Sequence, residues 1–185
     1  MNAIANETLA SNGTEQVKKG ASTSRRAELL AERIEEGAAT LAAFAEDLSE
    51  TEWLIPVTEG GKDGRPVGVV VHHVASIYPI EVDLARTIAS GKAVTDVTWE
   101  VVAHINSHHA RDHAGVTKSA TLELLRRNSL EAAAAVRKFT EEELDQAAPF
   151  SLSFGAPVTA QFVIEDHALR HSWHHLAAIR KALAR

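Results

Sequence analysis

Residues 67–90 read VGVVVHHVASIYPIEVDLARTIAS, and this stretch decides the fold. Its apolar residues recur at steps of three and four, which places them together on one side of an α-helix. The helix is expected to begin near Pro66, because proline is tolerated in a first helical turn, and to stop at Gly91. Pro79 lacks a backbone donor and should kink it. A long apolar helix of this kind predicts a fold built from packed helices.

The same period recurs on both sides of this stretch. Helices are predicted over residues 25–48, 99–114, 118–139 and from about 159 almost to 185. Two capping boxes, Ser49 with Glu52 and Thr140 with Glu143, indicate short helical turns. The core positions expected on two of these helices are Leu29, Leu30, Ile34, Leu41, Phe44 and Leu48, then Leu122, Leu125, Leu130, Ala133, Ala134 and Val136. Residues 148–158 alternate around Gly155 and favour a short extended piece, so the pattern predicts a helical bundle.

Composition narrows the possible functions. The chain has 185 residues, a net charge of −6 and no cysteine. An acidic chain is a poor ligand for nucleic acid or anionic membranes, and without cysteine neither a disulfide nor a thiol nucleophile is possible. No N-terminal apolar segment or membrane-spanning run is expected, which predicts a cytoplasmic protein. Residues 1–22 are expected to form a flexible tail and residues 23–185 a single domain.

The last predicted helix carries four of the ten histidines, in DHALRHSWHHLAAIR (residues 166–180). With His167 set at zero on a helical wheel, His171 lies at about 40°, His175 at about 80° and His174 at about 340°. His171 and His175 therefore border the apolar side, whereas His167 and His174 point toward its polar flank. Two imidazoles four residues apart can reach one metal ion, as they do in HExxH helices. The motif here lacks the glutamate that serves as base in that class.

His73 is the expected third member of the site. On the wheel of residues 67–90 it lies within the apolar cluster, and His72 lies about 100° away on the polar side. A single buried histidine is more often a hydrogen-bonded core residue than a ligand. Inward histidines on two separate helices favour a three-histidine metal site, which leaves a coordination position open for water or substrate.

The remaining candidates are less defined. His104, His108, His109 and His113 spread around their wheel and are interpreted as residues of the surface or of a pocket rim, with His108 the one expected to approach the site. Trp99 and Trp173 are interpreted as packing residues. Glu81 lies on the core side of its helix and is a candidate base or orienting partner, although a salt bridge is the commoner role for such a residue.

Two motifs give the chain a resemblance to the DinB/YfiT-like superfamily of four-helix metalloproteins. RPVGVVVHHVA (residues 65–75) resembles the motif of the family's second helix, and HSWHHLAAI (residues 171–179) resembles that of its last helix. The resemblance spans about residues 25–185 and implies metal ligands at His73, His171 and His175. Ala178 and Arg65 depart from it, since the family often has glutamine and an aromatic residue there.

The resemblance also implies an all-α, up-down-down-up four-helix bundle that is often dimeric and holds a divalent metal, with zinc or nickel expected here. Known activities in the superfamily include transferases that use bacillithiol or mycothiol and a mycothiol-dependent maleylpyruvate isomerase. The leading hypothesis is therefore a metal-dependent thiol S-transferase of detoxification that takes its thiol from a cosubstrate and acts on a small molecule. A metal-dependent hydrolase and a non-catalytic, stress-associated metal-binding protein are the alternatives.

Overall fold

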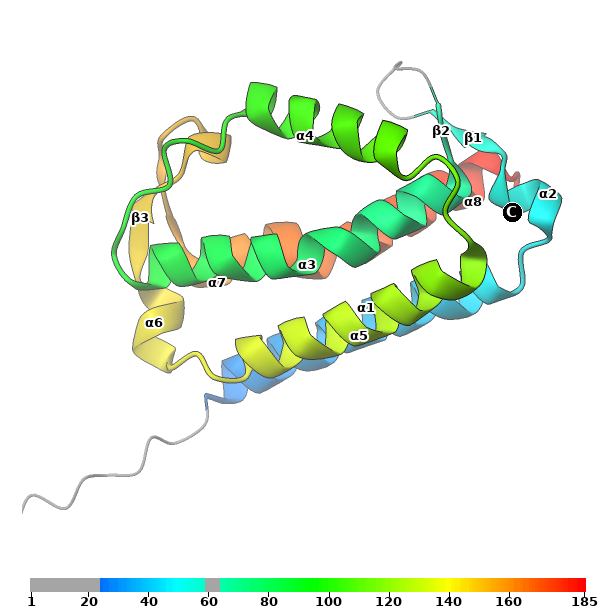
Figure 1. Cartoon of the computed structure of the whole chain (residues 1–185). Coiled ribbons are helices and arrows are strands. Elements are labelled where there is room, and N and C mark those ends of the chain that lie inside the picture. The colour runs from blue at the N-terminus through cyan, green and yellow to red at the C-terminus, as the bar shows by residue number, and fades with distance from the viewer. Residues whose placement is uncertain (1–23, 59–63) are drawn as a thin grey trace, which may run out of the picture.

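The computed structural model describes residues 24–58 and 64–185. Within them, the long helices α1, α3 and α5 pack with a composite last helix into a four-helix bundle (Figure 1). The bounds of these elements are Arg25–Glu46 for α1, Val67–Ala89 for α3, Lys118–Val136 for α5, and Ala160–Val163, Ile164–Leu169 and Arg170–Ala182 for α7, η2 and α8. The predicted all-α bundle is confirmed. The tail predicted for residues 1–22 lies outside the described residues.

The connections give the bundle its up-down-down-up order. In Figure 1, α1 runs from left to right, α3 and α5 both return from right to left, and α8 runs to the right again. Two parallel helices need a crossover between them. Helix α4, Trp99–Asp112, supplies that crossover and lies along the outside of α3.

Short elements close the two ends of the bundle. At one end, α2 (Glu50–Trp53) is followed by the antiparallel pair β1 (Pro56–Val57) and β2 (Arg65–Pro66). At the other, α6 (Glu141–Asp145) precedes the pair β3 (Ala147–Pro149) and β4 (Pro157–Thr159), which enclose the 3₁₀ turn η1 (Ser151–Ser153). Both predicted capping boxes are present. The predicted extended piece is the second pair, and most of the loop predicted before Pro66 lies outside the described residues.

The last helix is irregular in a way that the sequence pattern did not indicate. It begins at the N-cap Thr159, as expected, but residues 164–169 form a π-helix before α8 starts. A π-helix bonds i to i+5, so it advances by less than 100° per residue and turns the preceding side chains relative to an ideal wheel. The direction predicted for His167 therefore fails, while His171 and His175 lie on the regular part.

The core of α5 is more polar than predicted. Leu130, 58% exposed, and Ala134 face solvent, whereas Thr121, Asn128 and Ser129 are buried. Asn128 Nδ2 donates to the Ala75 carbonyl at 2.8 Å, which satisfies a polar group between α5 and α3. The apolar pattern alone could not place these residues. On α1, Leu29 is likewise exposed rather than buried.

Helix α3 is the most apolar element. By length and mean hydropathy it could cross a membrane, contrary to the expectation that no such run exists, but 61% of its most apolar window is buried inside the bundle. The core helix of a water-soluble protein has the same properties. Its burial here is that of a core helix, because α5 and the composite last helix pack against it and α4 lies along its outer side.

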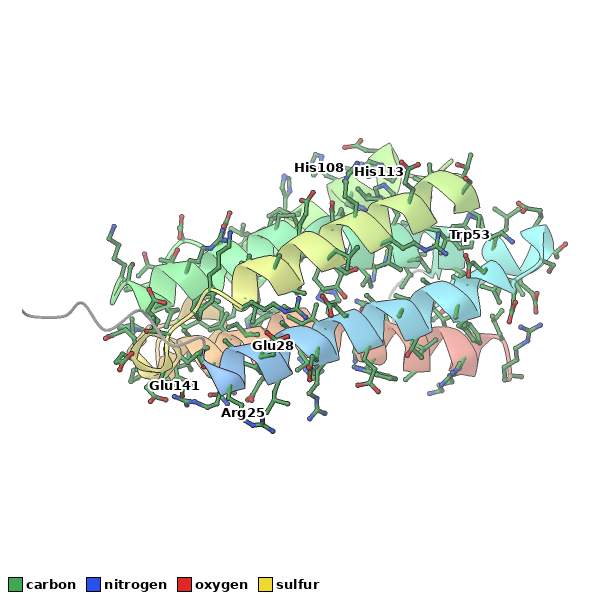
Figure 2. All side chains as sticks on the ribbon, turned by 90° about the horizontal axis from the view of Figure 1, so that it is seen from below. Arg25, Glu28, Trp53, His108, His113 and Glu141 are labelled. Atoms are coloured by element: carbon green, nitrogen blue, oxygen red, sulfur yellow. The ribbon has the colours of Figure 1, made fainter. Side chains whose placement is uncertain are left out.

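Trp53 fixes the start of α3. Its ring is 3% exposed, and its Nε1 donates to the Val116 carbonyl at 3.2 Å. Figure 2 shows Trp53 at one end of the bundle and Glu141 at the other. The ring lies against Gly68, where a Cβ would stand 2.3 Å from Nε1. Gly68 is therefore the position that admits the tryptophan.

Replacing Gly68 with alanine should destabilise the protein by about 1–3 kcal/mol, because the added methyl group must displace the Trp53 ring or helix α3. Urea unfolding followed by circular dichroism measures the effect. Gly115→Ala is the matched control, since nothing lies within 4 Å of the added carbon there. Equal stability of the two variants would contradict this account of the Trp53 contact.

Candidate metal centre

Three histidines from two helices converge inside the bundle, and we call them the His73 cluster. His73 comes from α3, and His171 and His175 come from successive turns of α8. One ring nitrogen of each lies within 4.8 Å of the corresponding nitrogens of the other two. His171 Nε2 and His73 Nε2 are 3.1 Å apart. Two nitrogens bound to one tetrahedral zinc ion at 2.0–2.1 Å would be about 3.3–3.4 Å apart, so His73 and His171 already stand close to the spacing of two ligands.

Glu81 orients one ring of this cluster. It lies two helical turns after His73 on α3, is 3% exposed, and its Oε1 forms a short contact with His171 Nδ1. A carboxylate at Nδ1 favours the tautomer that carries its proton there and presents the Nε2 lone pair. That lone pair points to the side where His73 Nε2 lies. The Oε2 atom of Glu81 is buried and has no hydrogen-bond partner among the described residues.

The frame around the cluster is buried and hydrogen-bonded. Tyr78 Oη and Ser172 Oγ are 2.6 Å apart, and this bond ties α3 to α8 at the residue next to His171. Both residues are buried. Burial, reinforced by His171 and His175, holds the pKa of His73 far below its usual range. His73 is therefore neutral at pH 7, as a metal ligand must be.

A cavity of about 400 Å³ opens beside the cluster. Its apolar wall comes from α3 and α4, and it is lined among others by Ile77, Ile80, Leu84, Val102 and Ile105. The three histidines and Glu81 lie on its inner side. Trp99 is a rim residue with 55% of its surface exposed, not the packing residue that was predicted. Trp173 lies against Gly37 but is itself 37% exposed, so it is only partly the packing residue that was predicted.

The other histidines of the last helix differ from each other. His174 is exposed, as its place on the wheel predicts. His167 is not on a polar flank: it lies edge-on to Phe150, with ring centroids 5.5 Å apart, and lines the cavity. Burial lowers its pKa, although Glu81 and Asp166 oppose that effect. The π-helix that precedes α8 accounts for the difference.

The histidines of α4 also depart from expectation. His104 and His108 are exposed and lie against each other, so His108 does not approach the His73 cluster. His109 does, with its ring centroid 5.5 Å from that of His73. His109 and His113 meet His72 in a separate group. Helix α4 has no buried residue, so its wheel offered no apolar side from which an inward direction could be defined.

Comparison with known proteins places the fold. No protein-family model and no curated protein matches the chain. Among solved structures, the chain is similar to YfiT from Bacillus subtilis, which is described as a probable metal-dependent hydrolase with an unusual four-helix bundle topology. The two sequences are 20% identical, and the structures superpose with a TM-score of 0.66. The match covers 89% of this chain and 90% of YfiT. A second similar structure is the colibactin self-resistance protein ClbS, solved in complex with a dsDNA. It is 17% identical in sequence and has a TM-score of 0.66, and the match covers 86% of this chain and 96% of ClbS.

These likenesses establish the fold. The chain has the YfiT/DinB-like four-helix bundle that the two sequence motifs predicted. The match covers 90% or more of the length of each of these two structures.

The lowered pKa of His73 predicts acid sensitivity of the metal-free protein. An unfolded histidine has a pKa of about 6.5, and the folded one here is lower. Below pH 6.5 the unfolded chain therefore binds a proton that the folded chain excludes, and stability falls. The loss should be about 1.4 kcal/mol per pH unit for this residue.

Urea unfolding with a chelator at pH 7.5 and 5.5 measures this slope. His73→Gln should reduce it, whereas His104→Gln, at an exposed position, should leave it unchanged. An unchanged slope in His73→Gln would show that the buried imidazole is not the group being titrated.

Proposed function

We propose that this protein is a metal-dependent enzyme in which His73, His171 and His175 bind a divalent metal ion. The observation that carries the proposal is the convergence of their three ring nitrogens at the inner wall of the cavity, with Glu81 on the far side of one ring. Three neutral nitrogen ligands suit zinc or nickel. They leave a coordination position open, which is the arrangement of catalytic rather than structural sites.

The protein's own residues define what such a site can do. A bound divalent ion lowers the pKa of a coordinated nucleophile and polarises the bond that it attacks. Glu81 keeps His171 in the ligating tautomer, and the apolar wall keeps bulk water away from the reacting group. The volume of the cavity matches that of a small organic substrate.

Hydrolysis of a small, mainly apolar substrate is the reaction that this arrangement supports best. It requires only water in addition to the ion, and the description of YfiT as a probable metal-dependent hydrolase points the same way. Thiol S-transfer is the second candidate. The polar groups Arg65, Asn106 and Arg170 on the lining of the cavity could bind a polar thiol cosubstrate beside the apolar wall.

The net charge of the chain and its fold indicate which binding partners to expect. ClbS was solved with a dsDNA, but the net charge of −6 in this chain opposes binding to phosphates. We therefore expect a small-molecule substrate and no nucleic acid. A homodimer in the cytoplasm remains our prediction, and light scattering of the purified protein would measure its oligomeric state.

Substitution of one proposed ligand histidine should remove one bound zinc ion. We expect His171→Ala to bind one equivalent less zinc than the wild type, as measured by elemental analysis after dialysis. His174→Ala is the matched control, because it removes an exposed histidine from the same helix. Unchanged zinc content in both His171→Ala and His73→Ala would contradict the assignment of ligands.

Turnover distinguishes the two reactions. With ester and amide substrates, the zinc-loaded protein should be active without added thiol, and His171→Ala should lose at least about 100-fold in kcat/KM. Activity toward an electrophile that appears only with a low-molecular-weight thiol would establish the transferase instead. Stoichiometric metal without either activity would favour the non-catalytic metal-binding protein.

Glu81→Gln tests the orienting role separately. It should weaken zinc affinity by about 10- to 100-fold, because a neutral amide is a poorer acceptor for the His171 ring. Competition with a chromophoric chelator measures the affinity. Glu123→Gln removes an exposed carboxylate on α5 and should have no effect. An equal loss in both variants would show that net charge, and not the contact with His171, is responsible.

A further inference from the structure

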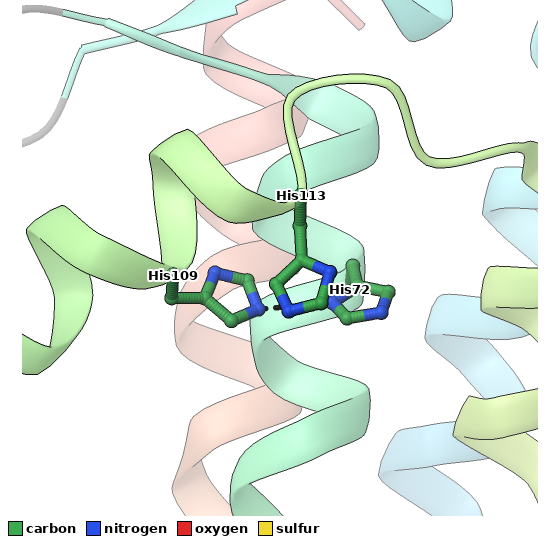
Figure 3. Close-up of side chains that lie close together, drawn as sticks. All are labelled: His72, His109 and His113. Carbon is green, nitrogen blue, oxygen red and sulfur yellow. Dashed lines mark hydrogen bonds between the residues drawn. The ribbon is translucent and has the colours of Figure 1, made fainter.

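A second group of three histidines lies between α3 and α4, and we call it the His72 cluster. It consists of His72 from α3, His109 from α4 and His113 at the C-cap of α4. Figure 3 shows the three rings converging from these two elements. One nitrogen of each ring lies within 4.8 Å of the other two, the same limit that the His73 cluster satisfies.

The two clusters share one arrangement. Each takes one histidine from α3 and a pair four residues apart from a second helix, which is α8 in one and α4 in the other. His72 and His73 are adjacent, so their side chains leave α3 about 100° apart and point to different neighbours. A pair at i and i+4 stands on one face of its helix and can reach one ion.

The distances within the cluster suit ligation. His72 Nδ1 and His109 Nε2 are 2.9 Å apart, and the ring centroids of His72 and His113 are 4.1 Å apart. Ser76 Oγ is a further polar neighbour, 3.3 Å from His109 Nε2. All three rings are half-buried rather than solvated.

Hydrogen bonding alone does not account for this cluster. Three neutral imidazoles have three N–H donors and three acceptor nitrogens to satisfy. Yet His109 Nδ1 is buried without a partner among residues 24–58 and 64–185. The contact with His72 is made by His109 Nε2, so Nδ1 points away from the cluster and does not itself face the site. It shows that the hydrogen bonding of the three rings is incomplete among the described residues.

We propose that His72, His109 and His113 form a second binding site for a divalent transition-metal ion, distinct from the proposed catalytic site. Imidazole-only ligands select zinc, nickel or copper over magnesium or calcium, which take oxygen ligands. The bound ion ties α4 to α3. Helix α4 has no buried residue of its own, and it forms part of the cavity wall, so the second site holds that wall in place.

Zinc stoichiometry of the purified full chain tests the proposal, with zinc itself as the probe. Equilibrium dialysis should give two ions for the wild type, one for His113→Ala and one for His171→Ala, and none for the double variant. His108→Ala removes an exposed histidine from the same helix and should retain two. Thermal unfolding confirms that each variant is folded.

The other possible zinc stoichiometries distinguish failure of the second site from failure of the proposed catalytic site. One ion in the wild type that is lost in His113→Ala but kept in His171→Ala would support the second site and contradict the proposed catalytic one. One ion that His113→Ala leaves in place would overturn the second site. One ion lost in both single variants would mean a single shared ion and would also overturn it.

Amide hydrogen exchange provides the second measurement. Zinc should slow exchange across residues 99–112 in the wild type and in His108→Ala, and His113→Ala should abolish that protection while keeping the protection of α8. Equal protection of α4 in His113→Ala would show that the cluster does not bind the ion that orders this helix.

Discussion

The burial of helix α3 is the constraint on which the rest of the structure depends. Helix α5 and the composite last helix cover it, yet it carries His73 and Glu81 into this covered interior. Polar groups are costly there unless each finds a partner. His171 supplies the partner for Glu81, and His171 can do so only if α8 packs beside α3 in one register. The geometry of the site and the packing of the bundle are therefore the same constraint.

The charge of a buried carboxylate at Glu81 is a second constraint on the site. A carboxylate as buried as Glu81 is stabilised by positive charge nearby, and one of its oxygens has no hydrogen-bond partner in the described part of the chain. Imidazoles that act as metal ligands are neutral and provide none. A divalent ion among them would offset the carboxylate through the ring of His171, which is how such carboxylates act in known metal sites. A bound divalent ion would therefore account both for the buried Glu81 carboxylate and for the clustering of the three histidines.

The sequence pattern predicted those parts of the fold and site that regular helices determine. The convergence of His73, His171 and His175 could be predicted because α3 has an apolar side and α8 is regular between the two histidines. His167 could not be placed, since it precedes α8 within the π-helix. His109 and His113 were missed because α4 has no buried side to serve as a reference. Leu130 was misplaced because buried polar residues of α5 occupy positions that an apolar pattern does not reveal.

The crossover explains why a cavity lies beside the His73 cluster at all. Since α3 and α5 are parallel, the chain must return outside the bundle, and α4 makes that return along α3. The four helices of the bundle already form the core, so α4 packs outside it and has no buried residue. Its apolar residues Val102 and Ile105 face the cavity without filling it. A helix that is required by topology but not by the core is free to shape a pocket, and the contact between His72 and His109 joins it to α3 close to the His73 cluster.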